Sequence, residues 1–215
     1  MDAIIFDVDG TLWDSTPQVA IAWQMIAKNC KVPYEHITPD RLHQEFGKMM
    51  KDIAYSIFSD LPKEEALGVL KECMDYEVAY LLSHPPLPYD GVEQVFKYFS
   101  KKMPLFIVSN CQAGYIEAFL EYFKVPWGDP SCLIEDIECY GNNFLQKDEN
   151  IKLLAERNKL TKACYVGDIQ SDYDATAKAG LPFIHAKYGF GTINVPVPEI
   201  KKFSDLTKVV KEVLK

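Results

Sequence analysis

The sequence predicts an α/β protein in which a parallel sheet has helices on both faces and an all-helical domain is inserted near its start. Three observations support this prediction. Residues 1–6 form a short apolar, β-branched run that stops at Asp7, as expected for a buried strand. Residues 17–83 then carry almost no strand pattern. After residue 92, strand patterns alternate with helical ones, which favours a parallel sheet covered by helices.

The insert is predicted to be helical throughout. Residues 17–29 are densely apolar, and residues 63–82 place apolar side chains at helical spacing. Thr38 before Pro39 is typical of a helix cap followed by proline in the first turn. A proline cluster after residue 84 stops the last helix. We therefore assign residues 15–86 to the insert, and residues 1–14 and 87–215 to the main domain.

The part of the chain after the insert predicts the rest of the sheet and its helices. Strands are expected at residues 105–108, 132–134, 163–166 and 183–186. Helical patterns lie at residues 92–99, 116–123, 148–158, 171–179 and 206–213. Gly180 fits the position of a helix C-cap. These elements complete the predicted layers on the two faces of the sheet.

Composition excludes several classes of protein. Apolar residues make up 48% of the 215 residues and charged residues 25%, which is an ordinary globular mixture. The net charge of −8 argues against a nucleic-acid partner. Apolar runs are far shorter than the ~18 residues of a membrane span, and no signal peptide is visible. The six cysteines form no C-x-x-C pair, so we expect free thiols and a cytoplasmic protein.

Polar side chains follow several of the predicted strands, at the edge where ligands bind in open parallel sheets. They comprise four carboxylates, a hydroxyl, an amide and a lysine that precedes a helix: Asp7, Asp9, Ser109, Asn110, Lys147, Asp168 and Asp172. So many negative charges at one edge call for a cation. Oxygen ligands of this type suit Mg²⁺, and an aspartate beside a metal can act as a nucleophile.

Each of these residues also has a purely structural explanation. Asp9 and Gly10 form a common turn dipeptide, so residues 4–13 also fit a β-hairpin. Asp172 could serve only as a favourable charge at a helix N-terminus, and Lys147 could be a surface lysine. Their joint order at successive strand ends is what favours a site.

The motifs resemble those of the haloacid dehalogenase-like hydrolases. Residues 7–12, Asp-Val-Asp-Gly-Thr-Leu, match the first signature of that family, and Ser109-Asn110 matches the second. Lys147 is identified with the third, and residues 167–172 match the fourth, an acidic pair four residues apart after a glycine. The insert lies where the helical-cap branch carries its cap. The resemblance therefore implies a Rossmann-like core with a helical cap, most similar to phosphoglycolate phosphatases.

The resemblance also implies roles for individual residues. Asp7 would attack phosphorus, and Asp9 would protonate the leaving alcohol and then activate water. Mg²⁺ would bind the Asp7 and Asp168 carboxylates and the backbone carbonyl of Asp9, with Asp172 as a further ligand or a neighbouring acid. Phosphate oxygens would be bound by Ser109, Asn110 and Lys147, with Lys152 as the alternative lysine. Thr11 would orient Asp9, and Lys48, between two cap helices, would meet a distal anionic group of the substrate.

The predicted function is a Mg²⁺-dependent phosphatase that hydrolyses phosphate monoesters of small metabolites through an aspartyl-phosphate. Asp9 argues against dehalogenation, because attack on carbon needs no acid for an alkoxide leaving group. A phosphomutase of the same family is the first alternative, and a non-enzymatic phospho-receiver or binding module is a remote one. Cys111 stands where phosphoglycolate phosphatases often carry a lysine, which leaves the substrate open. The sequence is compatible with a monomer or a homodimer.

Overall fold

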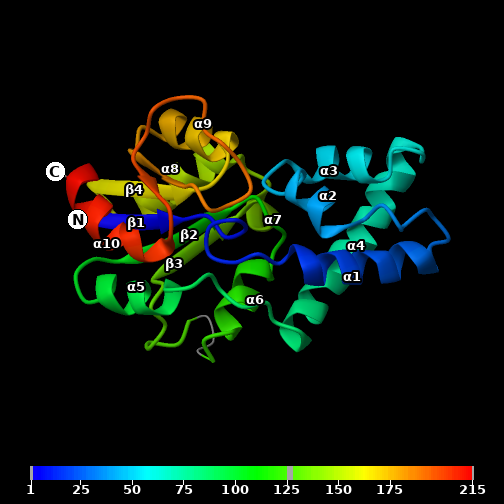
Figure 1. Ribbon diagram of the computed structural model, residues 1–215, viewed down its shortest axis with the longest axis horizontal. Coiled ribbons are helices and arrows are strands. Elements are labelled where there is room, and N and C mark those ends of the chain that lie inside the picture. The colour runs from blue at the N-terminus through cyan, green and yellow to red at the C-terminus, as the bar shows by residue number, and fades with distance from the viewer. Residues whose placement is uncertain (1, 125–127, 215) are drawn as a thin grey trace.

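A computed structural model describes residues 2–124 and 128–214 of the protein. Its centre is a six-stranded sheet in the order β3-β2-β1-β4-β5-β6, in which all neighbouring strands are parallel (Figure 1). The predicted α/β class with a helical insert is confirmed. The hairpin alternative for residues 4–13 is wrong, because β1 pairs with β2 and β4 and has no antiparallel partner within that segment.

Among the described residues, five helices lie between β1 and β2, and strands and helices mostly alternate after that. The strands are β1 (Asp2–Phe6), β2 (Leu105–Ser109), β3 (Asp136–Cys139), β4 (Lys162–Gly167), β5 (Phe183–Ala186) and β6 (Glu199–Ile200). The helices before β3 are α1 (Thr16–Asn29), α2 (Pro39–His43), α3 (Met50–Ile57), α4 (Lys63–Ser83), α5 (Val92–Phe99) and α6 (Tyr115–Glu121). After β3 come α7 (Tyr140–Asn143), α8 (Lys147–Arg157), α9 (Gln170–Ala179), the 3₁₀ helix η1 (Phe203–Asp205) and α10 (Leu206–Val213).

The two faces of the sheet follow from the alternation of side chains along β1. Ile4 and Phe6 belong to one core cluster, and Ile5 belongs to the other. Helices α5 and α10 contribute to the first cluster, and α8 and α9 to the second. Figure 1 shows α8 and α9 on one side of the sheet and α5 and α10 on the other. Both faces are covered, which explains why β1 is apolar at nearly every position.

The helical insert lies beyond the carboxyl edge of the sheet, where α1 runs alongside α4 (Figure 1). Thr38 caps α2 as predicted, because its hydroxyl accepts a hydrogen bond from the amide of Arg41. The two connections to the main domain meet at an antiparallel bridge between Trp13 and Pro88. The proposed boundaries, residues 15–86 for the cap and 1–14 with 87–215 for the core, stay a prediction.

The predicted strand at residues 132–134 is wrong, because β3 begins later, at Asp136. The apolar pattern missed it, since two acidic residues alternate along this edge strand. Arg157 of α8 contacts them, at 2.7 Å from Asp136 and 2.9 Å from Glu138. The short elements α3, α7, β6 and η1 were not resolved individually by sequence patterns. Among the described residues, no helix is long and apolar enough to cross a membrane.

Candidate active site

Three buried carboxylates meet at the carboxyl edge of the sheet. Asp7 follows β1, Asp168 follows β4, and Asp172 lies in the first turn of α9. Because β1 and β4 are parallel neighbours, the residues after them emerge side by side. One oxygen from each of the three carboxylates lies within 4.8 Å of the others. The three carboxylates predicted to lie at neighbouring strand ends therefore form a spatial cluster.

Lys147 is the lysine at this cluster. Its Nζ atom lies 2.8 Å from Oδ1 of Asp7 and 2.6 Å from Oδ1 of Asp172. Its side chain is only 4% exposed, at the first residue of α8. The alternative, Lys152, is 52% exposed and lies 3.5 Å from Asp148 on the same helix. The structure thus brings Lys147, and not Lys152, to the carboxylates.

Backbone amides fix the orientation of the other two carboxylates. Oδ2 of Asp172 accepts hydrogen bonds from the amides of Asp168 and Ile169, which lie just before α9. The carboxylate of Asp168 accepts a 2.7 Å hydrogen bond from the amide of Phe190. Asp172 thus closes the first turn of α9 with one oxygen and binds Lys147 with the other. The cluster is held in place before any ligand binds.

The cluster carries more negative charge than Lys147 balances. Burial raises the pKa of Asp7 to about 6, even though Lys147 acts in the opposite direction. Burial, together with the charges of Asp172 and Asp7, raises the pKa of Asp168 well above its usual range. A divalent cation would relieve this repulsion, and buried carboxylate oxygens are ligands of the kind that Mg²⁺ prefers. The residues present therefore fit the predicted metal.

Asp9 lies outside this cluster, in a different environment. Its Oδ1 accepts hydrogen bonds from the hydroxyl of Tyr115 at 2.6 Å, the hydroxyl of Ser15 at 2.9 Å and Nε1 of Trp13 at 3.1 Å. Burial raises the pKa of Asp9 to about 7, and these three hydrogen bonds limit the rise. An acid with such a pKa can both donate and accept a proton near neutral pH.

Thr11 does not orient Asp9 in the way we expected. It is fully buried, and its hydroxyl has no hydrogen-bond partner among the described residues. Ser15 and Tyr115 take that role together with Trp13. Sequence reasoning missed Tyr115, because a tyrosine 106 positions from Asp9 carries no local signal of this contact.

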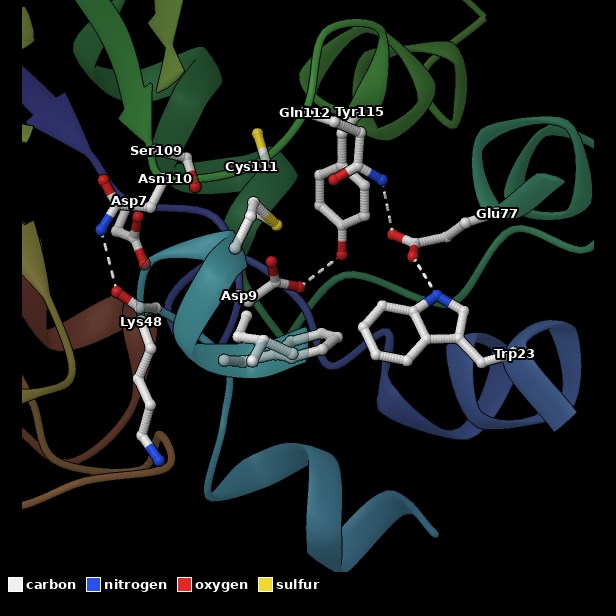
Figure 2. A pocket seen from close by; sticks show the side chains of 14 residues that line it. Asp7, Asp9, Trp23, Lys48, Glu77, Ser109, Asn110, Cys111, Gln112 and Tyr115 are labelled. Carbon is white, nitrogen blue, oxygen red and sulfur yellow. Dashed lines mark hydrogen bonds between the residues drawn. The ribbon is translucent and has the colours of Figure 1, made fainter. Parts of the chain in front are cut away.

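The remaining predicted residues surround the opening above Asp7 and Asp9. Ser109 ends β2, beside β1, and lines the same pocket as both aspartates. The side-chain amide of Asn110 donates a 2.8 Å hydrogen bond to the carbonyl of Gly47, which joins the core to the helical insert. Lys48 also lines the pocket, but its ammonium lies 3.0 Å from Glu45, and Figure 2 shows it extended away from Asp9.

The pocket lies between the sheet edge and the insert (Figure 2). Asp7, Asp9 and Ser109 line its core side, and Trp23 and Glu77 line its side formed by α1 and α4. Glu77 was not singled out by the sequence analysis. It lies within an ordinary helical stripe, where nothing in the sequence indicates that a carboxylate will be buried.

A helical insert after the first strand, placed over buried carboxylates at the edge of a parallel sheet, is the arrangement of the haloacid dehalogenase-like hydrolases. The chain belongs to this family: the family's sequence model matches residues 4–186. This segment includes Asp7, Asp9, Lys147 and Asp168, and it reaches from β1 to the end of β5.

Individual relatives are similar over almost the whole chain. The phosphoglycolate phosphatase of Aquifex aeolicus is 26% identical over 220 residues, which cover 98% of this chain and 97% of that protein. The phosphoglycolate phosphatase of Escherichia coli is 23% identical over 227 residues, with 92% and 86% covered. The crystal structure of a predicted phosphatase from Clostridium acetobutylicum has a TM-score of 0.81 at 21% identity, with 98% of each chain covered. This last likeness concerns the fold.

Proposed function

We propose that the protein is a Mg²⁺-dependent phosphatase that hydrolyses phosphate monoesters of small metabolites through an aspartyl-phosphate on Asp7. The observation that carries the proposal is the contrast between the two aspartates after β1. Asp7 lies against Lys147 within the carboxylate cluster, whereas Asp9 lies among three neutral donors and has a pKa of about 7. Two carboxylates in such different environments suit two different tasks.

Asp7 is the nucleophile in this proposal. Lys147 binds its Oδ1, which orients the carboxylate and favours its ionised form. An ionised carboxylate can attack phosphorus and become a mixed anhydride with the phosphoryl group. The hydroxyl of Ser109, the backbone at Asn110 and the ammonium of Lys147 would bind the phosphoryl oxygens, where negative charge gathers.

Asp9 is the general acid and general base in this proposal. In its protonated form it donates to the ester oxygen as the leaving alcohol departs, and in its ionised form it accepts a proton from the water that attacks the intermediate. A pKa of about 7 allows both states to be populated near neutral pH. Tyr115, Ser15 and Trp13 bind a single oxygen of Asp9, which leaves the other oxygen for the substrate.

Asp7, Asp168 and Asp172 are the residues that would hold Mg²⁺, together with the backbone carbonyl of Asp9. When bound, Mg²⁺ supplies positive charge that offsets the charge of the phosphoryl group. The insert contributes residues to the pocket and would limit the size of the substrate, so we assign small phosphorylated metabolites to this site.

The test is phosphate release from a panel of small phosphate esters, with Mg²⁺ and with EDTA. We expect Mg²⁺-dependent turnover that Asp7→Asn abolishes. Asp174→Asn is the matched control, because it removes the charge of an exposed aspartate on α9 and should leave turnover intact. If the protein isomerises a hexose phosphate and releases no phosphate, its assigned function changes from phosphatase to phosphomutase. Turnover that survives Asp7→Asn would refute the assigned nucleophile.

A further inference from the structure

Glu77 is a buried carboxylate on the substrate side of the pocket, and it is not part of the machinery above. Only 2% of the surface of Glu77 is exposed to solvent. Oε2 accepts a 2.5 Å hydrogen bond from Nε1 of Trp23, and Oε1 accepts a 2.9 Å hydrogen bond from the side-chain amide of Gln112. Figure 2 shows this carboxylate between Trp23 and Gln112, beyond Tyr115 as seen from Asp9. Each oxygen keeps a second lone pair for a further donor.

Glu77 has no balancing cation within the part of the chain that the structure describes. Among residues 2–124 and 128–214, no lysine, arginine or histidine forms an ion pair with it. Lys48 is the one cation among the described residues that line the pocket, and it binds Glu45 at 3.0 Å. Figure 2 shows Lys48 and Glu77 on opposite sides of Asp9. Burial, with a contribution from Asp9, raises the pKa of Glu77 to about 8. An acid with this pKa is largely protonated at neutral pH, and a cation that reaches it favours its ionised form.

Aromatic side chains surround the same space. Trp23, Phe46 and Tyr115 all line the pocket, and the rings of Trp23 and Phe46 lie 6.4 Å apart between centroids. Aromatic faces next to a carboxylate favour ammonium groups, because the ring quadrupole attracts positive charge. The aromatic rings and the unbalanced carboxylate thus favour the same kind of ligand.

We propose that Glu77 binds a cationic amine on the leaving group, so that the substrate is the phosphate monoester of a small amino alcohol. This inference rests on the proposed phosphatase function and names its substrate class. Hydrolysis consumes one water, breaks the bond between phosphorus and the ester oxygen, and releases the amino alcohol and inorganic phosphate. A leaving group that carries a carboxylate, as in phosphoglycolate, finds no free cation among the described residues that line the pocket and meets ionised Glu77 as a like charge, so it is disfavoured above pH 8, where Glu77 is ionised.

The test is run above pH 8, where Glu77 is ionised, and compares three esters of equal chain length that differ only at the far end: 2-aminoethyl phosphate, 2-hydroxyethyl phosphate and phosphoglycolate. We expect kcat/KM to be highest for the amine and at least about 10-fold lower for the carboxylate, since a close charge pair contributes well over this factor. A higher kcat/KM for the hydroxyl or the carboxylate ester would overturn the assignment of an amine.

Variants of Glu77 make the test specific to this side chain. Glu77→Gln removes the charge, and the ratio of kcat/KM for the amine to that for the carboxylate should fall at least about 10-fold. Glu77→Asp keeps the charge and should keep the amine as the preferred substrate. Glu65→Gln removes an exposed charge from the same helix and should leave the ratio unchanged. An unchanged ratio in Glu77→Gln would overturn the inference.

p-Nitrophenyl phosphate separates the inference from the function on which it rests. If the wild type hydrolyses this ester with Mg²⁺ but prefers phosphoglycolate to the amine, the role of Glu77 is overturned and the phosphatase function still holds. Absence of hydrolysis of all four esters would overturn the phosphatase function, and the amine assignment with it.

Discussion

The hydroxyl of Tyr115 donates a 2.6 Å hydrogen bond to Oδ1 of Asp9, and the same hydroxyl lies 2.6 Å from Oγ of Ser15. This contact ties the first residue of α6 to the loop after β1 and to the start of the insert. The acid of the proposed reaction is therefore held by two neighbours from its own stretch of chain, Trp13 and Ser15, and by Tyr115, which is 106 positions away in sequence. A polar network of this kind keeps its geometry only while every member has a partner.

Removing this hydroxyl should change the pH dependence of the reaction. The hydrogen bond from Tyr115 lowers the pKa of Asp9 from the higher value that burial alone would give. Tyr115→Phe therefore raises that pKa, and protonated Asp9 persists to higher pH. We expect the alkaline limb of the kcat/KM profile to move upward by about one pH unit, the equivalent of one moderate hydrogen bond. A limb that stays in place or moves downward would contradict the role of Asp9 as the acid.

Lys147 should be essential for stability as well as for turnover. Lys147→Gln leaves Asp7 and Asp172 buried without their cation, and we expect the free energy of unfolding in EDTA to fall by about 3–5 kcal/mol near neutral pH. Lys152→Gln, on the exposed face of the same helix, should cost less than about 0.5 kcal/mol. Urea unfolding measures both.

The loss of stability in Lys147→Gln should depend on pH. The pKa of Asp7, raised to about 6 in the folded protein, rises further without the lysine. Its folded form then holds a proton that the unfolded form releases, so stability falls as pH rises from about 4 to beyond 6. The deficit of the variant should therefore shrink when unfolding is measured at lower pH. A deficit that is constant with pH would show that the lysine acts through packing alone.

Asp168 should destabilise the protein when no metal is bound. Its pKa lies well above the usual range because of burial and two neighbouring carboxylates, so its ionised form costs free energy at neutral pH. Asp168→Asn keeps an oxygen for the amide of Phe190 and removes the charge. In EDTA we expect the thermal midpoint to rise, by about 2–4 °C for each ~1 kcal/mol gained. The midpoint shift on adding Mg²⁺ should be lost, and a shift equal to that of the wild type would rule out Asp168 as a ligand.

A side chain at Gly47 should strain the contact between the insert and the core. The main cost is the φ of +83°, which is unfavourable for other residues, and a Cβ atom there would also force the end of the Ile169 side chain, 2.2 Å away, to shift. Gly47→Ala should raise KM by about 10-fold, because a displaced loop also loses its hydrogen bond to Asn110. Gly68→Ala is the matched control: it lies in α4 with open space around it, and should stabilise the helix by about 0.5–1 kcal/mol.

Local sequence patterns were sufficient for most of the fold. The buried strands β1, β2, β4 and β5 are mostly apolar, because both faces of the sheet are covered by helices. The edge strand β3 was placed four residues too early, since its acidic residues are paired with Arg157, which lies on another element. The local sequence of a strand carries no information about a partner residue on another element.

The site also contains residues that the sequence predicted and residues that it did not. Asp7, Lys147, Asp168 and Asp172 were placed together because each lies at a strand end or a helix start, and the order of parallel strands brings those ends together. Tyr115 and Glu77 were missed, because their positions depend on how α6 and the insert pack above the sheet. The family resemblance supplied roles for the first group and gave no signal for the second.

The measurement that tests the central claim most directly is the trapping of a phosphorylated intermediate. Asp9→Asn removes the base that activates water, while p-nitrophenolate leaves without a proton, so the intermediate should accumulate with this ester and Mg²⁺. We expect acid-quenched protein to carry phosphate on the peptide that contains Asp7, and Asp7→Asn to carry none. Turnover without any protein-bound phosphate, or phosphate attached to Ser109 instead, would contradict the account.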